Sequence, residues 1–364
     1  MSNDAKNIRT GIVIPTKDRA DFVIRLLNYY ANTKSAHTLY IGDSSNDQEA
    51  KKIQAAISKL NSTINIIYNH YPQLNSWQCM ISLYSLVKEP YAVYIGDDDY
   101  WIPDTLNDCV RFLENNPDYE TAIGKSITFK VEANGAYGKL KELHDYYRYP
   151  IEGETASERL FDYVGPHLTS IIGAVIKTDK MLKYYQDSFE VPDTSIRGEF
   201  LPSCFMVIGG KHKVIDRLGY LRQIHISHLI NPDIFHWITK DTWYLSYSLF
   251  KNKTANALMA KDSISREKAE QVFKQSMWYY LQKYLPKEYA NYVNQLYPPP
   301  PRKLTVRNKV AKSFPFLKQI YRNYVRPILS PQKEQLHYEV MQPGSKYYND
   351  FKPIFNSLSN EFRD

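Results

Sequence analysis

"YIGDDDYW", residues 94–101, places three consecutive aspartates directly after a short apolar run. Adjacent carboxylates repel one another, and a solvated turn does not need three of them. The preceding residues, "YAVYIG" at 91–96, are apolar and aromatic, a pattern typical of a buried strand. The sequence therefore predicts that the aspartates stand at the end of a strand and face a positively charged group.

The first 115 residues alternate between strand patterns and helix patterns. Strand patterns occupy 11–16, 38–47, 63–69 and 91–96, and helix patterns occupy 18–32, 48–60, 77–84 and the stretch that Pro103 opens. Asp18 is predicted to be the N-cap of the first helix. This alternation predicts an α/β fold with a doubly wound, mostly parallel sheet.

The alternation weakens after Phe129. A further strand is expected at 169–178, and a helix followed by a strand is expected over 200–216. From about residue 241 the pattern becomes helical and aromatic, and the prolines of "YPPPPRK" at 297–303 cannot continue a helix. We therefore expect an α/β domain at 1–240 and a helical C-terminal region at 241–364.

The net charge of +7 is concentrated in one segment. Residues 302–326 hold eight basic side chains and no acidic one, and the rest of the chain has 38 basic and 39 acidic residues. Leu317, Ile320, Tyr321 and Tyr324 follow helical spacing, so this segment predicts a basic amphipathic helix suited to an anionic membrane surface. The alternative is that its apolar face packs on the α/β domain as core. No RNA-binding pattern accompanies it, and we expect no nucleic-acid partner.

The composition indicates a reducing compartment. Cys79, Cys109 and Cys204 lie far apart without metal-ligand spacing, which argues against a disulfide framework. The residues at the start lack the apolar core of a secretory signal, and no apolar run is long enough to span a bilayer. We therefore expect a cytoplasmic protein that binds the membrane peripherally at most.

The expected topology gathers the acidic residues in one crevice. Ligands of open α/β sheets bind beyond the carboxyl ends of the strands, where Asp43 and the Asp97–Asp99 turn should both lie. Clustered carboxylates there are costly without a cation among them. Mg²⁺ or Mn²⁺ is expected, because both prefer oxygen ligands and leave positions open to phosphate and water.

Three sequence motifs resemble those of a known protein family. "GIVIPTKDR" at 11–19, "IGDSSND" at 41–47 and "YIGDDDYWIPDTL" at 94–106 resemble the family 2-type glycosyltransferases with the GT-A fold, clearly over about 9–116 and more weakly to about 229. The resemblance implies that Asp97 and Asp99 bind a divalent metal on the diphosphate of a nucleotide-sugar. The nucleotide-sugar itself would be contacted by Pro15, Thr16, Arg19, Asp43, Asp97 and Asp98. The turn after the second strand, "GDSSND", departs from the family's usual "DDGS", and "NHYPQLN" at 69–75 lacks its glycine and arginine.

The resemblance also implies a general base and further phosphate or metal contacts. Inverting relatives place an acidic residue at the head of a helix well past the aspartates, and Glu199 in "SIRGEFLPS" fits that place, with Asp193 in reserve. Retention of configuration remains open. In "RQIHISH", Arg222 is expected to clamp the diphosphate, and His225 or His228 is expected to be a third metal ligand.

The expected function is the metal-dependent transfer of a sugar from a nucleotide-sugar to a glycan or a lipid-linked glycan. One alternative is a nucleotidyltransferase acting on sugar phosphates, but "PTKDRADF" at 15–22 lacks the glycine-rich loop that such enzymes use for phosphates. The other alternative is a catalytically inactive glycan-binding paralogue. The aspartates and a candidate base together argue against it.

Overall fold

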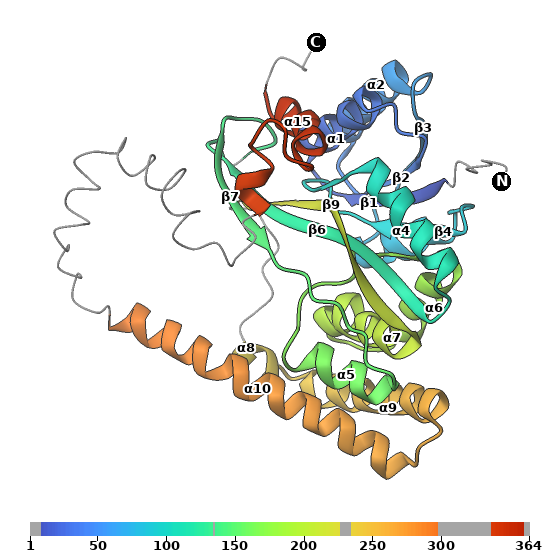
Figure 1. Cartoon of the computed structure of the whole chain (residues 1–364), viewed down its shortest axis with the longest axis vertical. Coiled ribbons are helices and arrows are strands. Elements are labelled where there is room, and N and C mark those ends of the chain that lie inside the picture. The colour runs from blue at the N-terminus through green and yellow to red at the C-terminus, as the bar shows by residue number, and fades with distance from the viewer. Residues whose placement is uncertain (1–8, 134, 226–233, 298–335, 360–364) are drawn as a thin grey trace.

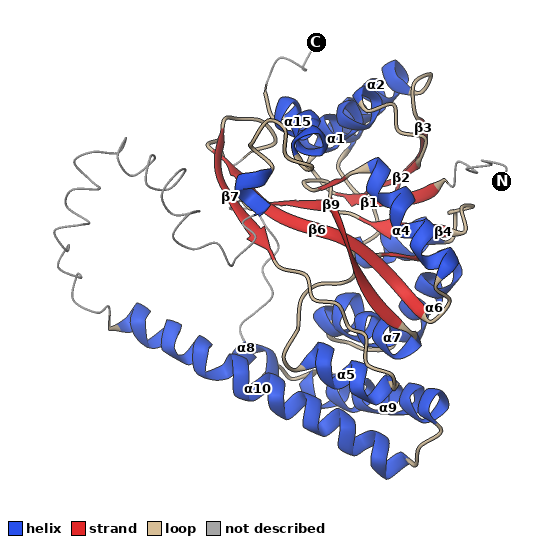
Figure 2. Ribbon diagram, viewed as in Figure 1, coloured by secondary structure: helices blue, strands red, loops and turns tan. Residues whose placement is uncertain are grey.

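The computed structural model describes residues 9–133, 135–225, 234–297 and 336–359 (Figure 1). A nine-stranded sheet runs through the molecule with helices on both faces (Figure 2). Its order is β3-β2-β1-β4-β8-β6-β9-β5, and β7 pairs with β6. The strands are β1 (Thr10–Thr16), β2 (Thr38–Asp43), β3 (Asn65–His70), β4 (Tyr91–Tyr94), β5 (Tyr100–Trp101), β6 (Tyr119–Val131), β7 (Leu140–Tyr146), β8 (Val175–Lys177) and β9 (Lys211–Gln223).

The helices follow in the same chain order. They are α1 (Ala20–Asn32), α2 (Asp47–Leu60), α3 (Ser76–Tyr84), α4 (Pro103–Asn115), α5 (Ala156–Val164), α6 (Thr178–Ser188), the π-helical turn η1 (Ile196–Phe200), α7 (Leu201–Gly209), α8 (Ile234–Ile238), α9 (Trp243–Asp262), α10 (Arg266–Leu296), α14 (Leu336–Glu339) and α15 (Tyr348–Ser357). Pro103 is the first residue of α4, where its missing N–H costs nothing.

The N-terminal half of the sheet confirms the predicted parallel arrangement. β1 pairs in parallel with β2 and β4, and β2 pairs in parallel with β3. The residues of β1 and β2 are buried almost throughout, as expected of parallel strands covered on both faces. Their carboxyl ends therefore meet at one edge, beside the aspartates that follow β4.

The second half of the sheet is mixed. β6 and β9 are parallel, whereas β8 runs antiparallel to both β4 and β6, and β5 runs antiparallel to β9. The strand expected over 169–178 is reduced to β8, because Ile171 and Ala174 form a turn closed by a hydrogen bond of 2.9 Å. This turn lets the carbonyl of Gly173 accept a bond of 3.0 Å from the indole of Trp101.

The prediction that Asp18 caps the first helix is wrong. Helix α1 begins at Ala20 and has no side-chain cap. Asp18 has a left-handed backbone (φ 53°), and its carboxylate accepts hydrogen bonds of 3.0 and 2.8 Å from the backbone and side chain of Asn46. Asp18 thus ties the loop after β1 to the residue that caps α2.

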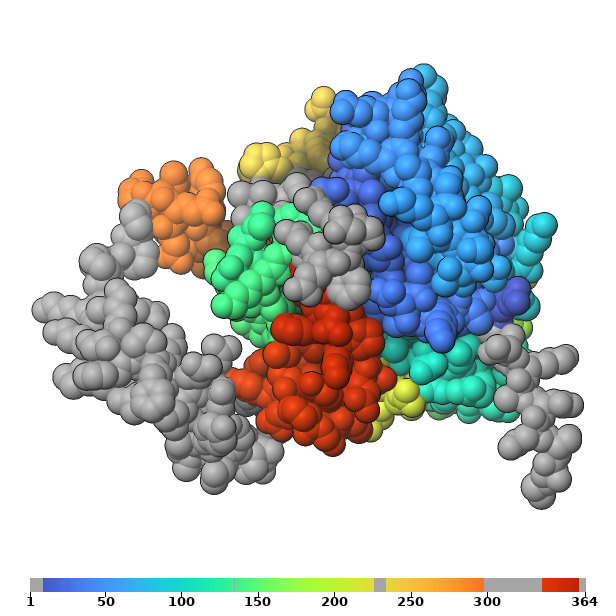
Figure 3. All heavy atoms as spheres, turned by 90° about the horizontal axis from the view of Figure 1, so that it is seen from above, coloured from blue at the N-terminus to red at the C-terminus, as the bar shows by residue number. Residues whose placement is uncertain are grey.

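The C-terminal helices pack into two hydrophobic cores that also contain residues from the first 240 positions. Phe250 of α9 and Phe273 of α10 belong to the core that contains α5 and α7, and the carboxylate of Asp262 caps α5 by accepting bonds of 2.8 Å from the amides of Ala156 and Ser157. α15 lies against α1 (Figures 1 and 3) and fills the core on that face. Residues from 241 onward therefore form no separate core within the described part of the chain.

None of the helices that the structure describes is both long enough and apolar enough to cross a bilayer. The basic segment 302–326 lies outside the described residues.

Candidate active site

A cavity of about 1000 Å³ opens beyond the carboxyl ends of β1 and β4. Its floor is the turn of Asp97, Asp98 and Asp99, residues that are only 3–4% exposed. Other lining residues come from both halves of the sheet and from the helices, and those used below are Pro15, Thr16, Arg19, Ser44, Tyr146, Arg148, Tyr163, Glu199, Phe200, Arg222, Trp237 and Tyr280. The cavity therefore lies where an open α/β sheet binds its ligands.

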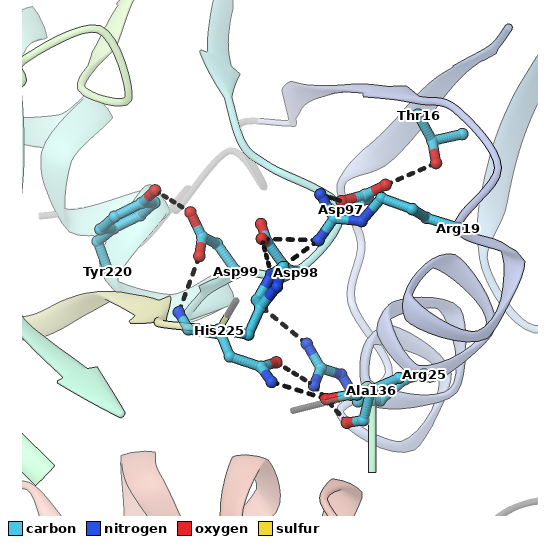
Figure 4. A network of polar contacts seen from close by, with 11 residues as sticks. Thr16, Arg19, Arg25, Asp97, Asp98, Asp99, Ala136, Tyr220 and His225 are labelled. Atoms are coloured by element: carbon cyan, nitrogen blue, oxygen red, sulfur yellow. Dashed lines mark hydrogen bonds and ion pairs between the residues drawn. The ribbon is translucent and has the colours of Figure 1, made fainter. Parts of the chain in front are cut away.

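Asp97 is held by residues at the end of β1. The hydroxyl of Thr16 donates a hydrogen bond of 2.6 Å to Oδ2, and Nη1 of Arg19 lies 3.2 Å from Oδ1. Figure 4 shows both groups reaching the aspartate from the neighbouring strand and loop. The structure thus brings together three of the residues predicted to bind the nucleotide-sugar.

The carboxylate of Asp98 contacts two side chains, those of Arg19 and His225. Nη2 of Arg19 lies 2.8 Å from its Oδ2, and Nε2 of His225 lies 2.7 Å from the same oxygen. The His225 side chain is fully buried and stacks on Phe22 with ring centroids 5.2 Å apart. His225 thus contacts the carboxylate of Asp98 and is not among the lining residues of the cavity.

Asp99 is held by β9. Its Oδ1 accepts a bond of 2.9 Å from the backbone amide of Gln223, and its Oδ2 accepts a bond from the hydroxyl of Tyr220. Both donors are uncharged, so these two contacts orient the carboxylate without neutralising it. Asp99 is therefore fixed by β9, and it lines the cavity.

The acidic turn crowds three buried carboxylates together. Burial raises the pKa of Asp97 to about 7 despite Arg19, and it raises the pKa of Asp99 well above its ordinary range, with the neighbouring Asp98 charge adding to the effect. A divalent cation on the cavity side of Asp97 and Asp99 would favour their ionised forms. In the described part of the chain, no three His, Cys, Asp or Glu side chains are grouped so that they could hold a metal ion by themselves. An ion on Asp97 and Asp99 would therefore need further ligands from phosphate and water.

Asp43 lies behind the cavity wall. It is fully buried, its Oδ2 accepts a bond of 2.8 Å from Tyr68, and its Oδ1 accepts one of 2.8 Å from the amide of Ser45. Its neighbour Ser44 lines the cavity in its place. Asp43 therefore shapes the loop after β2, and its predicted contact with the nucleotide stays a prediction.

Glu199 and Asp193 have different surroundings. Glu199 projects from η1 into the cavity and is partly exposed. Asp193 is buried, and its Oδ1 accepts bonds of 3.0 Å from the amides of Ser195 and Ile196, which begin the helical turn. Asp193 is thus occupied as a cap, and Glu199 is the carboxylate of this pair that a substrate can reach.

Arg222 lines the cavity as predicted for a phosphate-binding residue, and His228 lies outside the described residues. Sequence reasoning missed Arg148, whose guanidinium lies 3.9 Å from the ring centre of Tyr146 and also points to the cavity. Arg222 is 5.9 Å from the same ring, so two guanidinium groups lie near Tyr146. The local sequence "DYYRYP" at 145–150 shows no motif that would indicate a binding residue, because the position of Arg148 depends on long-range strand pairing.

The sequence also did not predict an aromatic wall opposite the aspartates. Trp237 of α8 and Tyr280 of α10 approach each other edge to face, 6.3 Å apart, and Phe200 of η1 lies 5.7 Å from Tyr280. All three line the cavity, together with Tyr163. The helices beyond residue 233 therefore form part of the cavity wall.

Comparison with known proteins establishes the fold. No protein-family profile and no curated protein sequence matches the chain. Solved structures of S. aureus TarS do match. TarS 1–349 shares 11% identity at a TM-score of 0.50 over 96% of this chain and 89% of that one. Its complex with UDP-GlcNAc shares 14% identity at a TM-score of 0.50 over 80% of this chain and 76% of that one.

The chain spans 44% of the length of the longer TarS structure, with 13% identity and a TM-score of 0.50 over 76% of this chain. TarS is a family 2 glycosyltransferase of the GT-A type. The predicted GT-A-like α/β fold is thereby confirmed.

Proposed function

We propose that this chain is a glycosyltransferase that moves a sugar from a nucleotide-sugar to a glycan or lipid-linked glycan. The observation that carries the proposal is the buried triple-aspartate turn, which forms the floor of a cavity of about 1000 Å³ in a GT-A-type fold. A cavity of that volume accommodates a nucleotide-sugar, since drug-sized ligands occupy about 300–1,000 Å³.

Two observations support a nucleotide-sugar as the donor. TarS has been solved in complex with UDP and with UDP-GlcNAc, which supports a nucleotide-sugar donor for a chain with the same fold. In this chain, Thr16, Arg19 and Arg222 line the cavity near the aspartates. The guanidinium of Arg222 suits a diphosphate, because arginine binds phosphate oxygens in pairs.

We further propose that Asp97 and Asp99 hold Mn²⁺ or Mg²⁺ together with the donor diphosphate. The support is the crowding of buried carboxylates in the turn that forms the floor of the cavity, because a divalent ion would stabilise their ionised forms. A divalent ion there would stabilise the negative charge that develops on the leaving diphosphate. His225, which contacts Asp98, is proposed to orient that carboxylate, and a direct metal bond from His225 would require its ring to move.

Glu199 is proposed as the general base of an inverting transfer. Glu199 lies on η1, lines the same cavity as the aspartate turn and is partly exposed. A base must come within hydrogen-bond reach of the acceptor hydroxyl, and this position allows that. The acceptor would then lie between Glu199 and the aromatic wall, whose rings suit the apolar faces of sugars.

The proposed location is the cytoplasmic face of a membrane, where residues 302–326 would contact anionic lipids. The support is the sequence, with eight basic residues and no acidic one in that stretch. A lipid-linked acceptor would then be available to the cavity.

The experiment is a release assay with a panel of nucleotide-sugars, with Mn²⁺, with Mg²⁺ and with EDTA. A glycosyltransferase releases nucleoside diphosphate and needs the divalent ion. A nucleotidyltransferase would instead make nucleotide-sugar and pyrophosphate from nucleoside triphosphate and sugar phosphate. Donor binding without release under any condition, including added glycan acceptors, would indicate the inactive paralogue.

A further inference from the structure

We infer that the outward face of α10 is a membrane-docking surface that inserts its aromatic side chains into the headgroup region of an anionic bilayer. Six large apolar side chains of α10 are 37–68% exposed. Tyr279 lies off to one side, and we call the other five the α10 stripe: Trp278, Leu285, Tyr289, Tyr292 and Leu296. The C-terminal part of α10, orange in Figures 1 and 3, stands away from the body.

The α10 stripe is one narrow line along the helix. At 3.6 residues per turn its five positions fall within about 60° of one another, and they extend over about 27 Å of helix. The residues that bury α10 against the body lie on the opposite side, and they are Ala269, Val272, Phe273, Ser276 and Met277. The two sets follow one another along the helix, so the protein buries α10 at residues 269–277, and the stripe is exposed from Trp278 onward in the part of the chain that the structure describes.

The chemistry of the stripe favours a lipid surface over a second copy of the chain. Helix-to-helix seams are built from Leu, Ile and Val, whereas three of these five residues are Trp or Tyr. Those side chains have an apolar ring and a polar tip, and they are enriched where a membrane meets water.

The charges near the stripe point the same way. Residues 274–296 contain three lysines and one glutamate, and the chain continues into the eight basic residues of 302–326. Two copies that paired through the stripe in parallel would bring these positive charges together, whereas an anionic bilayer neutralises them. Stable attachment of a protein to a membrane commonly takes two signals, and here they would be an apolar stripe and a basic segment.

Docking through the stripe would fix the position of the cavity. Tyr280 lines the cavity, and it lies on the opposite side of α10 from Trp278. A helix with its side chains is about 10–12 Å across. The aromatic wall of the cavity would therefore lie about one helix diameter from the bilayer surface, within reach of a lipid-linked sugar.

The test is co-sedimentation of the full chain with vesicles made of equal parts phosphatidylcholine and phosphatidylglycerol. The stripe variant is Tyr289→Ser, Tyr292→Ser and Leu296→Ser. The matched control removes two tyrosines and one leucine that are 53–83% exposed elsewhere, through Tyr147→Ser, Tyr244→Ser and Leu245→Ser. We expect the stripe variant to partition about tenfold or more weaker than the wild-type chain. The control variant should partition like the wild type.

The salt dependence of vesicle binding distinguishes the contribution of the stripe from that of the basic segment. Electrostatic attraction to the vesicles weakens at high salt, whereas burial of the stripe does not, so the difference between stripe variant and control should persist there. Trp278 gives a second readout, because its fluorescence should shift to shorter wavelength on vesicles, and that component should be missing in Trp278→Phe.

Three results would overturn the inference. One is equal vesicle binding by the stripe variant and the wild type when both have the same urea midpoint. A second is absence of vesicle binding at low salt. The third is a wild-type dimer that the stripe variant separates and that does not bind vesicles, which would assign the stripe to a second copy.

Discussion

The guanidinium of Arg25 donates a hydrogen bond of 2.7 Å to the main-chain carbonyl of Asp98, from a side chain that is 1% exposed. The same group donates bonds of 2.5 and 2.6 Å to the carbonyl of Ala136 and to Oε1 of Gln223. It also lies over the ring of Tyr100, 4.8 Å from its centre. The aspartate turn is therefore held in place from inside the protein as well as from the cavity.

Arg25→Met should destabilise the protein strongly. The substitution leaves three buried acceptors without their donor, and each costs about 1–3 kcal/mol, so a loss of about 3 kcal/mol or more is expected in urea unfolding. Arg111→Met is the control, since Arg111 is 58% exposed and its pair with Asp108 is worth at most about 1 kcal/mol. Equal unfolding midpoints for the two variants would contradict the structural role of Arg25.

Asp99→Asn should remove most transfer activity and leave the fold intact. An amide keeps the shape of the side chain and can still accept from Gln223, but it lacks the charge that a divalent ion needs. Loss of such electrostatic stabilisation costs about 10²–10³ in turnover. The measurement is nucleoside diphosphate release with saturating Mn²⁺, alongside the urea midpoint. Full activity of this variant, or of the wild type in excess EDTA, would remove the metal assignment.

Glu199→Gln should lower turnover by about 10²–10⁴ and leave donor affinity nearly unchanged, because a base acts on the acceptor hydroxyl. Asp193→Ala is the contrasting variant, since the carboxylate of Asp193 caps the turn that begins with Ser195 and alanine cannot replace that cap. It should cost about 1 kcal/mol of stability without a comparable loss of turnover. NMR of the product decides the stereochemistry, and retention of the donor's anomeric configuration would exclude this role for Glu199.

The sequence predicted the first half of the sheet and the place of the acidic turn, because both follow from local patterns. The apolar runs that end at Thr16, Asp43 and Tyr94 indicate parallel strands, and Asp97–Asp99 stand at one of their carboxyl ends. The burial of Asp43 depends on Tyr68 from the neighbouring strand, which no local pattern reveals.

The rest of the cavity depends on contacts between distant parts of the chain. Tyr220 reaches Asp99 because β9 pairs with β5, 121 residues earlier in the chain. Trp237 and Tyr280 meet only after α10 has packed on α5. Their helical spacing indicated helices, but it could not indicate which side chains would face a cavity formed by other elements.

His212→Asn should make the protein less sensitive to acid. Burial, with the nearby Arg148 cation adding to it, lowers the pKa of His212 to about 3, so below pH 6.5 the unfolded chain binds a proton that the folded chain does not. Stability should therefore fall as pH falls, by about 2 kcal/mol between roughly pH 7 and pH 5.

In His212→Asn this part of the pH dependence should disappear, while the amide can still bond to Thr121, which lies 2.7 Å from Nδ1 of His212. The measurement is the urea unfolding free energy at several pH values. His144→Asn serves as the control, because that ring is 60% exposed. An unchanged slope in His212→Asn would show that His212 is not the group responsible.

The last prediction concerns the basic segment 302–326. Ending the chain before Pro298 is not a clean test, because Leu336, Val340 and Phe351 pack into the core beside α1. Four replacements, Arg302→Gln, Lys303→Gln, Arg307→Gln and Lys309→Gln, keep those residues in place.

Each basic residue near an anionic surface contributes about 1 kcal/mol, so binding to anionic vesicles at low salt should fall by about two to three orders of magnitude. The control replaces four exposed lysines of the body, Lys34, Lys51, Lys59 and Lys141, by glutamine and changes the net charge equally. Equal losses in the two variants would mean that net charge, and not this segment, attracts the protein to the membrane.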